Sequence, residues 1–134
     1  MESDARAPEV DIQDRGHELI SSRRVEGTPV FDRGGEKIGK IHSVMIGKQS
    51  GTVAYALLSF GSFLGMGAMV HPIPWQMLEY DSRRDGYVVD LDKATLEKAP
   101  ALQVDLADRP RERSEDELVY SYYGQMPWWG GAPY

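Results

Sequence analysis

The chain has 134 residues, and its hydrophobic fraction of 41% and charged fraction of 27% are those of a globular protein with one core. It contains no cysteine, which excludes disulfides, zinc–thiolate sites, iron–sulfur clusters and a thiolate nucleophile. A formal net charge of −6 argues against general nucleic-acid binding, because affinity for phosphates depends on clustered lysine and arginine.

The acidic charge is concentrated at the two ends of the sequence. Residues 1–20 carry a net charge of −4 and residues 101–134 a net charge of −3, whereas the middle of the sequence is nearly neutral. Because no long apolar run is present, we expect no signal peptide, no membrane insertion and a cytoplasmic location. We predict a disordered acidic arm over 1–18, a folded domain over 19–100 and a C-terminal extension over 101–134.

The first half of the folded domain predicts three strands joined by tight turns. A short strand within 25–31 is followed by turn residues at 32–36. Residues 37–47 and 52–60 form the next two strands around a hairpin turn. Since 52–60 is apolar at odd and even positions alike, this strand is expected to be buried on both faces and to cross the centre of a small barrel.

The second half predicts a loop, short strands and a closing helix. Three glycines make 61–67 a loop. Pro72 and Pro74 remove donors from a strand ladder, so they are expected to separate two strands. Asp92 is expected to cap a short helix that ends before Pro100, because aspartate accepts from free backbone N–H groups. We predict the short strands at 69–71, 77–80 and 87–89.

This order of features resembles the PRC-barrel family. The resemblance is carried by 30–41 (VFDRGGEKIGKI), the turn at Gly51, the strand to Phe60 and 71–75 (HPIPW), and it extends over 19–100. The family includes the cytoplasmic domain of the photosynthetic reaction centre H subunit and the second domain of the ribosome maturation factor. It implies an all-β fold, a small barrel of short antiparallel strands with a closing helix and extended N- and C-terminal arms.

The resemblance also bears on function. PRC barrels are scaffolds on which proteins dock, and they share no catalytic residue set. The sequence shows neither the transmembrane helix of the reaction-centre subunit nor the N-terminal domain of the ribosome factor, so we expect neither role. It is most similar to the stand-alone bacterial form, a single barrel with extensions, whose members mostly have no assigned activity.

The glycine-rich loop at 61–67 has more than one interpretation. Glycines let backbone N–H groups approach a phosphate, but no Lys-Ser or Lys-Thr follows, which disfavours a P-loop. Its apolar residues Phe63, Leu64 and Met66 can instead form a tip that contacts a partner. Packing of the same residues onto the barrel end is the simpler alternative.

The C-terminal extension is rich in aromatic residues. Six of the thirteen aromatic residues lie in the last fifteen positions, and such side chains are enriched at protein contacts. They either fold back on the chain's own barrel or its dimer mate, or they capture another protein. The charged stretch 105–117 is predicted to be a linker. The candidate partner contacts are Phe63, Leu64, Met66, Trp75, Tyr120, Tyr122, Tyr123, Trp128 and Trp129.

We predict no catalytic, cofactor or metal site. His17, His42 and His71 lack metal-ligand spacing, and His71 is expected to hydrogen-bond the backbone. There is no Gly-x-Ser-x-Gly elbow, and the carboxylates between 79 and 85 suggest a solvated turn. The basic doublets at 23–24 and 83–84 have acids close by, which favours a solvated face over an RNA groove.

The sequence therefore predicts a non-enzymatic protein-interaction or assembly module with an unidentified protein partner. A homodimer is expected, because a small barrel with open strand edges gains from pairing. The alternative is a small-molecule- or RNA-binding accessory factor that uses the barrel mouth near Phe63 and Trp75.

Overall fold

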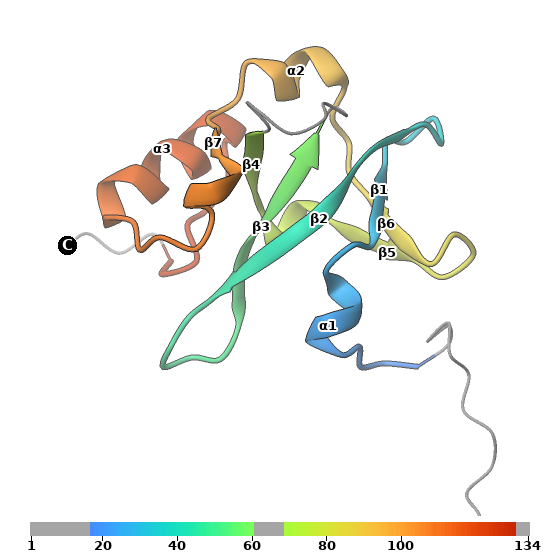
Figure 1. Ribbon diagram of the computed structural model, residues 1–134, viewed down its shortest axis with the longest axis horizontal. Coiled ribbons are helices and arrows are strands. Elements are labelled where there is room, and N and C mark those ends of the chain that lie inside the picture. Colours follow the sequence, from blue (N-terminus) through green and yellow to red (C-terminus); the bar gives the residue numbers. More distant parts are fainter. Residues whose placement is uncertain (1–16, 61–68, 131–134) are drawn as a thin grey trace, which may run out of the picture.

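One twisted sheet of seven strands dominates the computed structural model, which describes residues 17–60 and 69–130 (Figure 1). The strand order is β5-β6-β1-β2-β3-β4-β7. The strands are β1 (Pro29–Phe31), β2 (Lys37–Ile46), β3 (Val53–Phe60), β4 (Met69–Pro74), β5 (Glu79–Asp81), β6 (Gly86–Val88) and β7 (Leu102–Gln103). The helices are α1 (Ser22–Val25), α2 (Lys93–Glu97) and α3 (Arg113–Tyr123), with 3₁₀ turns η1 (Trp75–Met77) and η2 (Val104–Leu106).

The central hairpin of β2 and β3 confirms the strongest strand predictions. Ile41 lies opposite Leu58, and the two strands stay paired along nearly their whole length. Gly51 in the connecting turn has a φ of +75°, a conformation that glycine adopts without steric cost. Nearer the other end of the hairpin, Gly39 of β2 lies so close to β3 that a Cβ atom there would be 2.2 Å from the Ser59 carbonyl oxygen.

The sheet curls around an inner core. The largest cluster of buried side chains contains Tyr87 of β6 and Ile73 of β4. These two strands are not neighbours in the sheet order. Across the same gap, the rings of Trp75 and Tyr87 meet edge to face with centroids 5.3 Å apart. The sheet therefore wraps so that its distant strands share one apolar interior. The fully enclosed members of this core include Val30, Ile41, Leu58, Ile73 and Leu96.

One strand pair departs from the predicted antiparallel arrangement. β6 runs parallel to β1, with Val30 opposite Tyr87 and Phe31 opposite Val88. A parallel neighbour requires a crossover connection, and the long path through β4, η1 and β5 supplies it. The prediction of an entirely antiparallel barrel is therefore wrong for this pair.

β4 also differs from its prediction, because it continues through both prolines. Pro72 and Pro74 lie opposite Leu57 and Tyr55 of β3. The two prolines are two positions apart, so their missing donors point to the same side of the strand. β7 pairs only with Met69 and Val70, which leaves that side of the proline segment as a sheet edge, where proline is tolerated.

The short elements at the ends of the barrel match their predictions in part. Asp92 caps α2 by accepting from the Thr95 N–H, as predicted. The turn α1, capped by Ser21, stands before β1 and was not predicted. The strand expected at 77–80 is instead the 3₁₀ turn η1 followed by β5.

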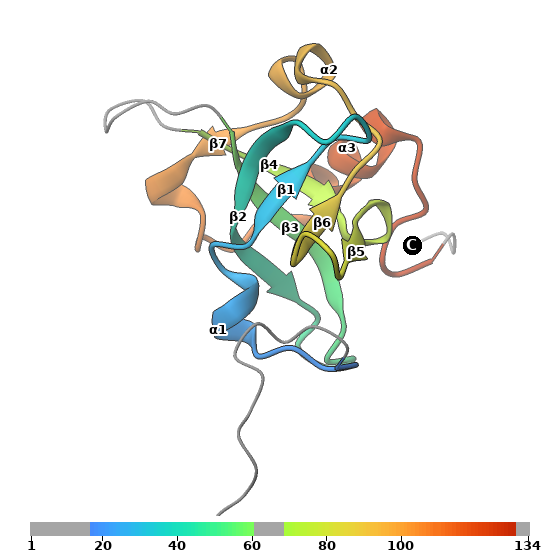
Figure 2. The ribbon, with the colours of Figure 1, turned by 90° about the vertical axis from the view of Figure 1, so that its right-hand side faces the viewer.

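The predicted linker at 105–117 is replaced largely by regular structure. η2 begins at Val104, and α3 begins at Arg113 with a capping box between Glu112 and Glu115. Gly124 ends the helix in the left-handed conformation. α3 packs beside β4, and both views show it well apart from α1 (Figures 1 and 2).

Candidate interaction surface at the C-terminal helix

Tyr120 packs α3 against the outer face of the sheet. Its side chain is only 1% exposed, and its hydroxyl donates a 2.9 Å hydrogen bond to the Ala54 carbonyl oxygen. Its ring meets Tyr55 edge to face and belongs to a second buried cluster with Leu57 and Val70. Burial raises the pKa of the Tyr120 hydroxyl above its usual range, so the group stays neutral. The apolar outer face of β3 is therefore covered by the C-terminal helix.

A polar cluster ties the start of α3 to the same strand. The Tyr55 hydroxyl donates to Asp116 at 2.9 Å, and Arg111 Nε donates to that hydroxyl at 3.1 Å. Burial, followed by the negative charge of Asp116, raises the pKa of Tyr55 to about 12. Burial also raises the pKa of Asp116, against the opposing effects of its bond from Tyr55 and the charge of Arg111. Two separate anchors thus hold α3, one near each end.

Four large apolar side chains of the segment 113–130 are exposed. Leu118 is 66% exposed, Met126 61%, Trp128 44% and Tyr122 40%. These four make up half of the large hydrophobic side chains that are exposed in the described part of the chain. They lie within eleven consecutive positions of the sequence, which sets this segment apart from the rest of the surface.

Trp128 is exposed but held in position. Its ring meets Trp129 edge to face with centroids 5.7 Å apart. The Arg113 guanidinium lies 5.8 Å from the centre of the Trp128 ring and 4.3 Å from that of Trp129. Such cation–π contacts orient the indoles on the flank of α3. The exposed Trp128 indole is therefore held in a defined orientation by Trp129 and Arg113.

A pocket of about 470 Å³ opens where the end of α3 meets the barrel. Two hydrogen bonds join its sides: Tyr122 donates to the Thr95 carbonyl oxygen at 2.7 Å, and Gln76 Nε2 donates to the Met126 carbonyl oxygen at 2.8 Å. The pocket thus has one wall from the barrel and one from the C-terminal segment. Its lining comprises Arg33, Gln76, Met77, Glu79, Asp90, Leu91, Thr95, Tyr122, Tyr123 and Gln125.

Tyr123 contributes a buried hydroxyl to this region. That oxygen has no hydrogen-bond partner among the described residues, although the ring packs against the inner core. Burial raises the pKa of the Tyr123 hydroxyl, so it remains a neutral group able to donate and to accept.

The structure divides the predicted contact residues into several groups. Phe63, Leu64 and Met66 lie outside the described residues. Trp75 is half-buried and packs against the inner core, whereas Tyr120 is fully enclosed. Trp129 packs partly against the second cluster. Tyr122 and Trp128 remain exposed, and Tyr123 lines the pocket.

Sequence reasoning missed two exposed side chains and most of the pocket. Leu118 lies four positions before Tyr122, a spacing that places both on one side of a helix. That signal was present in the sequence, but it is readable only once 113–123 is recognised as helical. The pocket residues come from five separate segments, and no local pattern brings them together.

His71 has a structural environment. Burial lowers its pKa, while a hydrogen bond with the backbone of Pro100 opposes that shift. Its ring meets Phe60 edge to face. The Pro100 backbone thus lies beside this histidine, as the predicted backbone contact requires, whereas its Nδ1 has no hydrogen-bond partner among the described residues. Within residues 17–60 and 69–130, no group of three or more His, Cys, Asp or Glu side chains is arranged to hold a metal ion.

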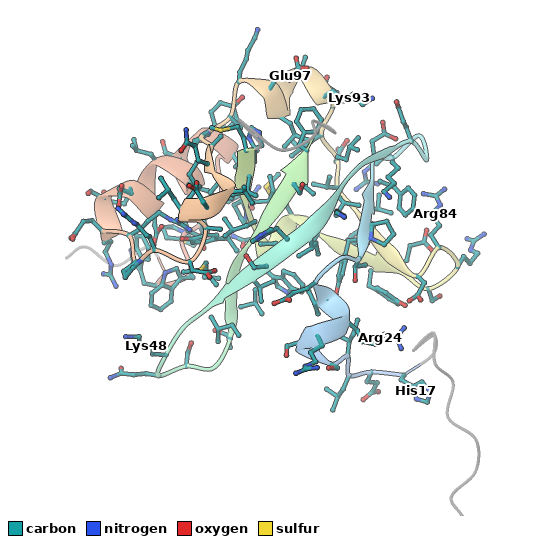
Figure 3. The ribbon with its side chains drawn as sticks, in the orientation of Figure 1. His17, Arg24, Lys48, Arg84, Lys93 and Glu97 are labelled. Atoms are coloured by element: carbon teal, nitrogen blue, oxygen red, sulfur yellow. The ribbon has the colours of Figure 1, made fainter. Side chains whose placement is uncertain are left out.

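The arginine doublets lie among acidic partners. Arg24 pairs with Asp85 at 3.8 Å, and Arg84 pairs with Asp81 at the same distance. Figure 3 shows Arg24 and Arg84 on the side of the molecule away from α3. Across the described ranges, no helix combines the length and the apolar character needed to cross a bilayer.

Comparison with known proteins gives one family. Residues 17–96 match the family model of the PRC-barrel domain, which is more than half of the chain. No curated protein matches the sequence. The matched region ends within α2, so β7, η2 and α3 lie beyond it.

Proposed function

The chain belongs to the PRC-barrel family, and on that premise we propose that it is a cytoplasmic, non-enzymatic protein-interaction or assembly module. Its contact surface is the outward side of the segment 113–130. The barrel serves as the rigid base, and α3 with the residues after it supplies the side chains that meet the partner.

The observation that supports this proposal is the exposure of large apolar side chains on an anchored segment. Leu118, Tyr122, Met126 and Trp128 are exposed, while Tyr120 between them is buried in the chain's own core. Single exposed apolar residues are ordinary, but several on one ordered segment are typical of contact surfaces. Tyrosine, tryptophan and methionine are also the residues enriched where proteins bind one another.

A photo-cross-linking residue at position 128 tests the proposal in the protein's native cells. We expect a specific cross-linked protein species, because Trp128 lies within the contact surface. The matched control carries the same cross-linker at Leu19, another exposed hydrophobic position, which is 85% exposed. Leu19 lies two residues after His17, which Figure 3 places away from α3.

The mass of the adduct identifies the partner. An adduct of twice the chain's mass supports the homodimer that the sequence predicts, and any other single mass supports a different protein. The same adducts from both positions, or none from position 128, would contradict the proposal.

One observation favours a second function. The 470 Å³ pocket falls within the range of about 300–1,000 Å³ that is common for small-ligand sites. Small-molecule binding is therefore the second candidate, although the pocket lining does not include Trp75, where the sequence predicts the ligand site. The RNA alternative gains no such support, since Arg24 and Arg84 both lie in ion pairs with aspartates.

A further inference from the structure

We propose that the pocket between the barrel and α3 binds the side chain of an arginine presented by the partner protein. This inference rests on the proposed function, because it assigns to the contact surface one specific recognition site. The ligand chemistry follows from the charges, the aromatic rings and the hydrogen-bond acceptors of the residues that line the pocket.

The charge of the lining favours a cation. Glu79 and Asp90 contribute two carboxylates, and Arg33 is the single cation of the lining. Glu79 forms no ion pair with any residue that the structure describes. Asp90 pairs with Arg33 at 3.6 Å, but both side chains are largely exposed, and such a surface pair contributes little. The Glu79 carboxylate is thus available to a cationic ligand, and the Asp90 carboxylate is bound only weakly by Arg33.

The rings in the pocket suit a guanidinium on an aliphatic stem. Tyr122 and Tyr123 meet edge to face with centroids 4.9 Å apart, so their faces point in nearly perpendicular directions. A planar guanidinium can lie over a tyrosine face, while its methylenes contact apolar groups such as Met77 and Leu91.

The acceptors in the pocket favour arginine over lysine. Gln76 uses its amide nitrogen to bond the Met126 carbonyl, which leaves its amide oxygen as an acceptor. Glu79 and Asp90 each add two carboxylate oxygens to the lining. Arginine offers five N–H donors in a fixed fork, whereas lysine offers one compact ammonium. One amide oxygen and two carboxylates in the same lining therefore match the arginine fork better than a single ammonium.

The test is a titration of the full chain followed by amide NMR shifts. The probe is N-acetyl-L-arginine N-methylamide, which carries the side chain as a protein would. We expect saturable shifts at Thr95, Tyr122 and Tyr123, with a Kd of about 1 mM, as befits a single side chain. The citrulline analogue keeps the shape but lacks the charge, so its binding should be at least tenfold weaker.

Three variants separate the proposed contact from general charge effects. Glu79→Gln should weaken probe binding about fivefold, whereas Glu97→Gln should leave it unchanged, because Glu97 lies on α2 outside the pocket lining (Figure 3). Arg33→Gln should tighten binding about twofold, since it frees Asp90 and removes a like charge.

Each opposite result overturns the inference. Equal binding of the citrulline analogue, no loss in Glu79→Gln, or weaker binding in Arg33→Gln would show that the pocket does not select a cation. Absence of saturable shifts up to 20-fold above the expected Kd, or about 20 mM, would show that it does not bind the side chain at all. The titration needs no partner, so its failure is distinct from failure of the cross-linking experiment.

Discussion

Replacing Tyr120 by alanine is expected to lower the free energy of unfolding by about 3–5 kcal/mol, the usual cost of deleting a buried aromatic side chain. The substitution removes a fully enclosed ring from the cluster between α3 and β3, and it removes the hydrogen bond to the Ala54 carbonyl. Urea denaturation followed by circular dichroism measures the change.

Two further variants calibrate that result. Tyr120→Phe keeps the ring and loses only the hydroxyl bond, so a cost of about 1 kcal/mol is expected. Tyr122→Ala alters a side chain that is 40% exposed, and its cost should be about 1 kcal/mol or less. If Tyr120→Ala were as mild as Tyr122→Ala, α3 would not be packed on β3 as described.

A second large effect is expected from Gly39→Ala, which should cost about 3 kcal/mol or prevent folding. An added Cβ would lie 2.2 Å from the Ser59 carbonyl oxygen and 3.1 Å from Leu58 Cδ1. The oxygen belongs to the backbone of β3, so the new methyl group can fit only if the central hairpin moves apart. The midpoint of thermal or urea unfolding reports the loss.

Gly51→Ala is the matched control for this prediction. Gly51 has a positive φ, but a Cβ there would meet nothing within 4 Å. Its cost should be about 1–2 kcal/mol, from the left-handed backbone alone. A Gly39→Ala variant as stable as Gly51→Ala would show that β2 and β3 are not in such close contact at this point.

Local signals explain the parts of the fold that could be predicted. The β2–β3 hairpin follows from two apolar runs separated by a glycine turn, and α2 follows from Asp92 as its cap. Each of these patterns is complete within about twenty residues. Family resemblance placed them correctly within one PRC-barrel domain.

Features that depend on distant parts of the chain could not be predicted. The parallel pairing of β1 with β6 depends on how residues 75–85 cross the molecule. β4 can continue through Pro72 and Pro74 because β7 is short and pairs only with Met69 and Val70. No neighbouring strand therefore requires the N–H donors that the prolines lack. Neither condition is encoded next to the residues that it affects.

In the candidate site, too, some features could be predicted from local sequence and others could not. The abundance of C-terminal aromatic residues drew attention to this segment, but it could not show which residue has which of the two roles. Tyr120 completes the core, whereas Trp128 remains exposed. The two-sided apolar pattern of β3 was a sign that something covers its outer face. Reading 105–117 as a linker hid the helix that does so, although Glu112, Glu115 and Gly124 carry its capping signals.

Amide hydrogen exchange of the full chain tests most directly whether the C-terminal segment belongs to the folded unit. The Tyr120 and Tyr55 anchors predict that amides near the end of α3, at 119–123, are protected to a degree similar to those of β3. Exchange of these α3 amides at the rate of an unstructured peptide, while β2 and β3 stay protected, would contradict the account.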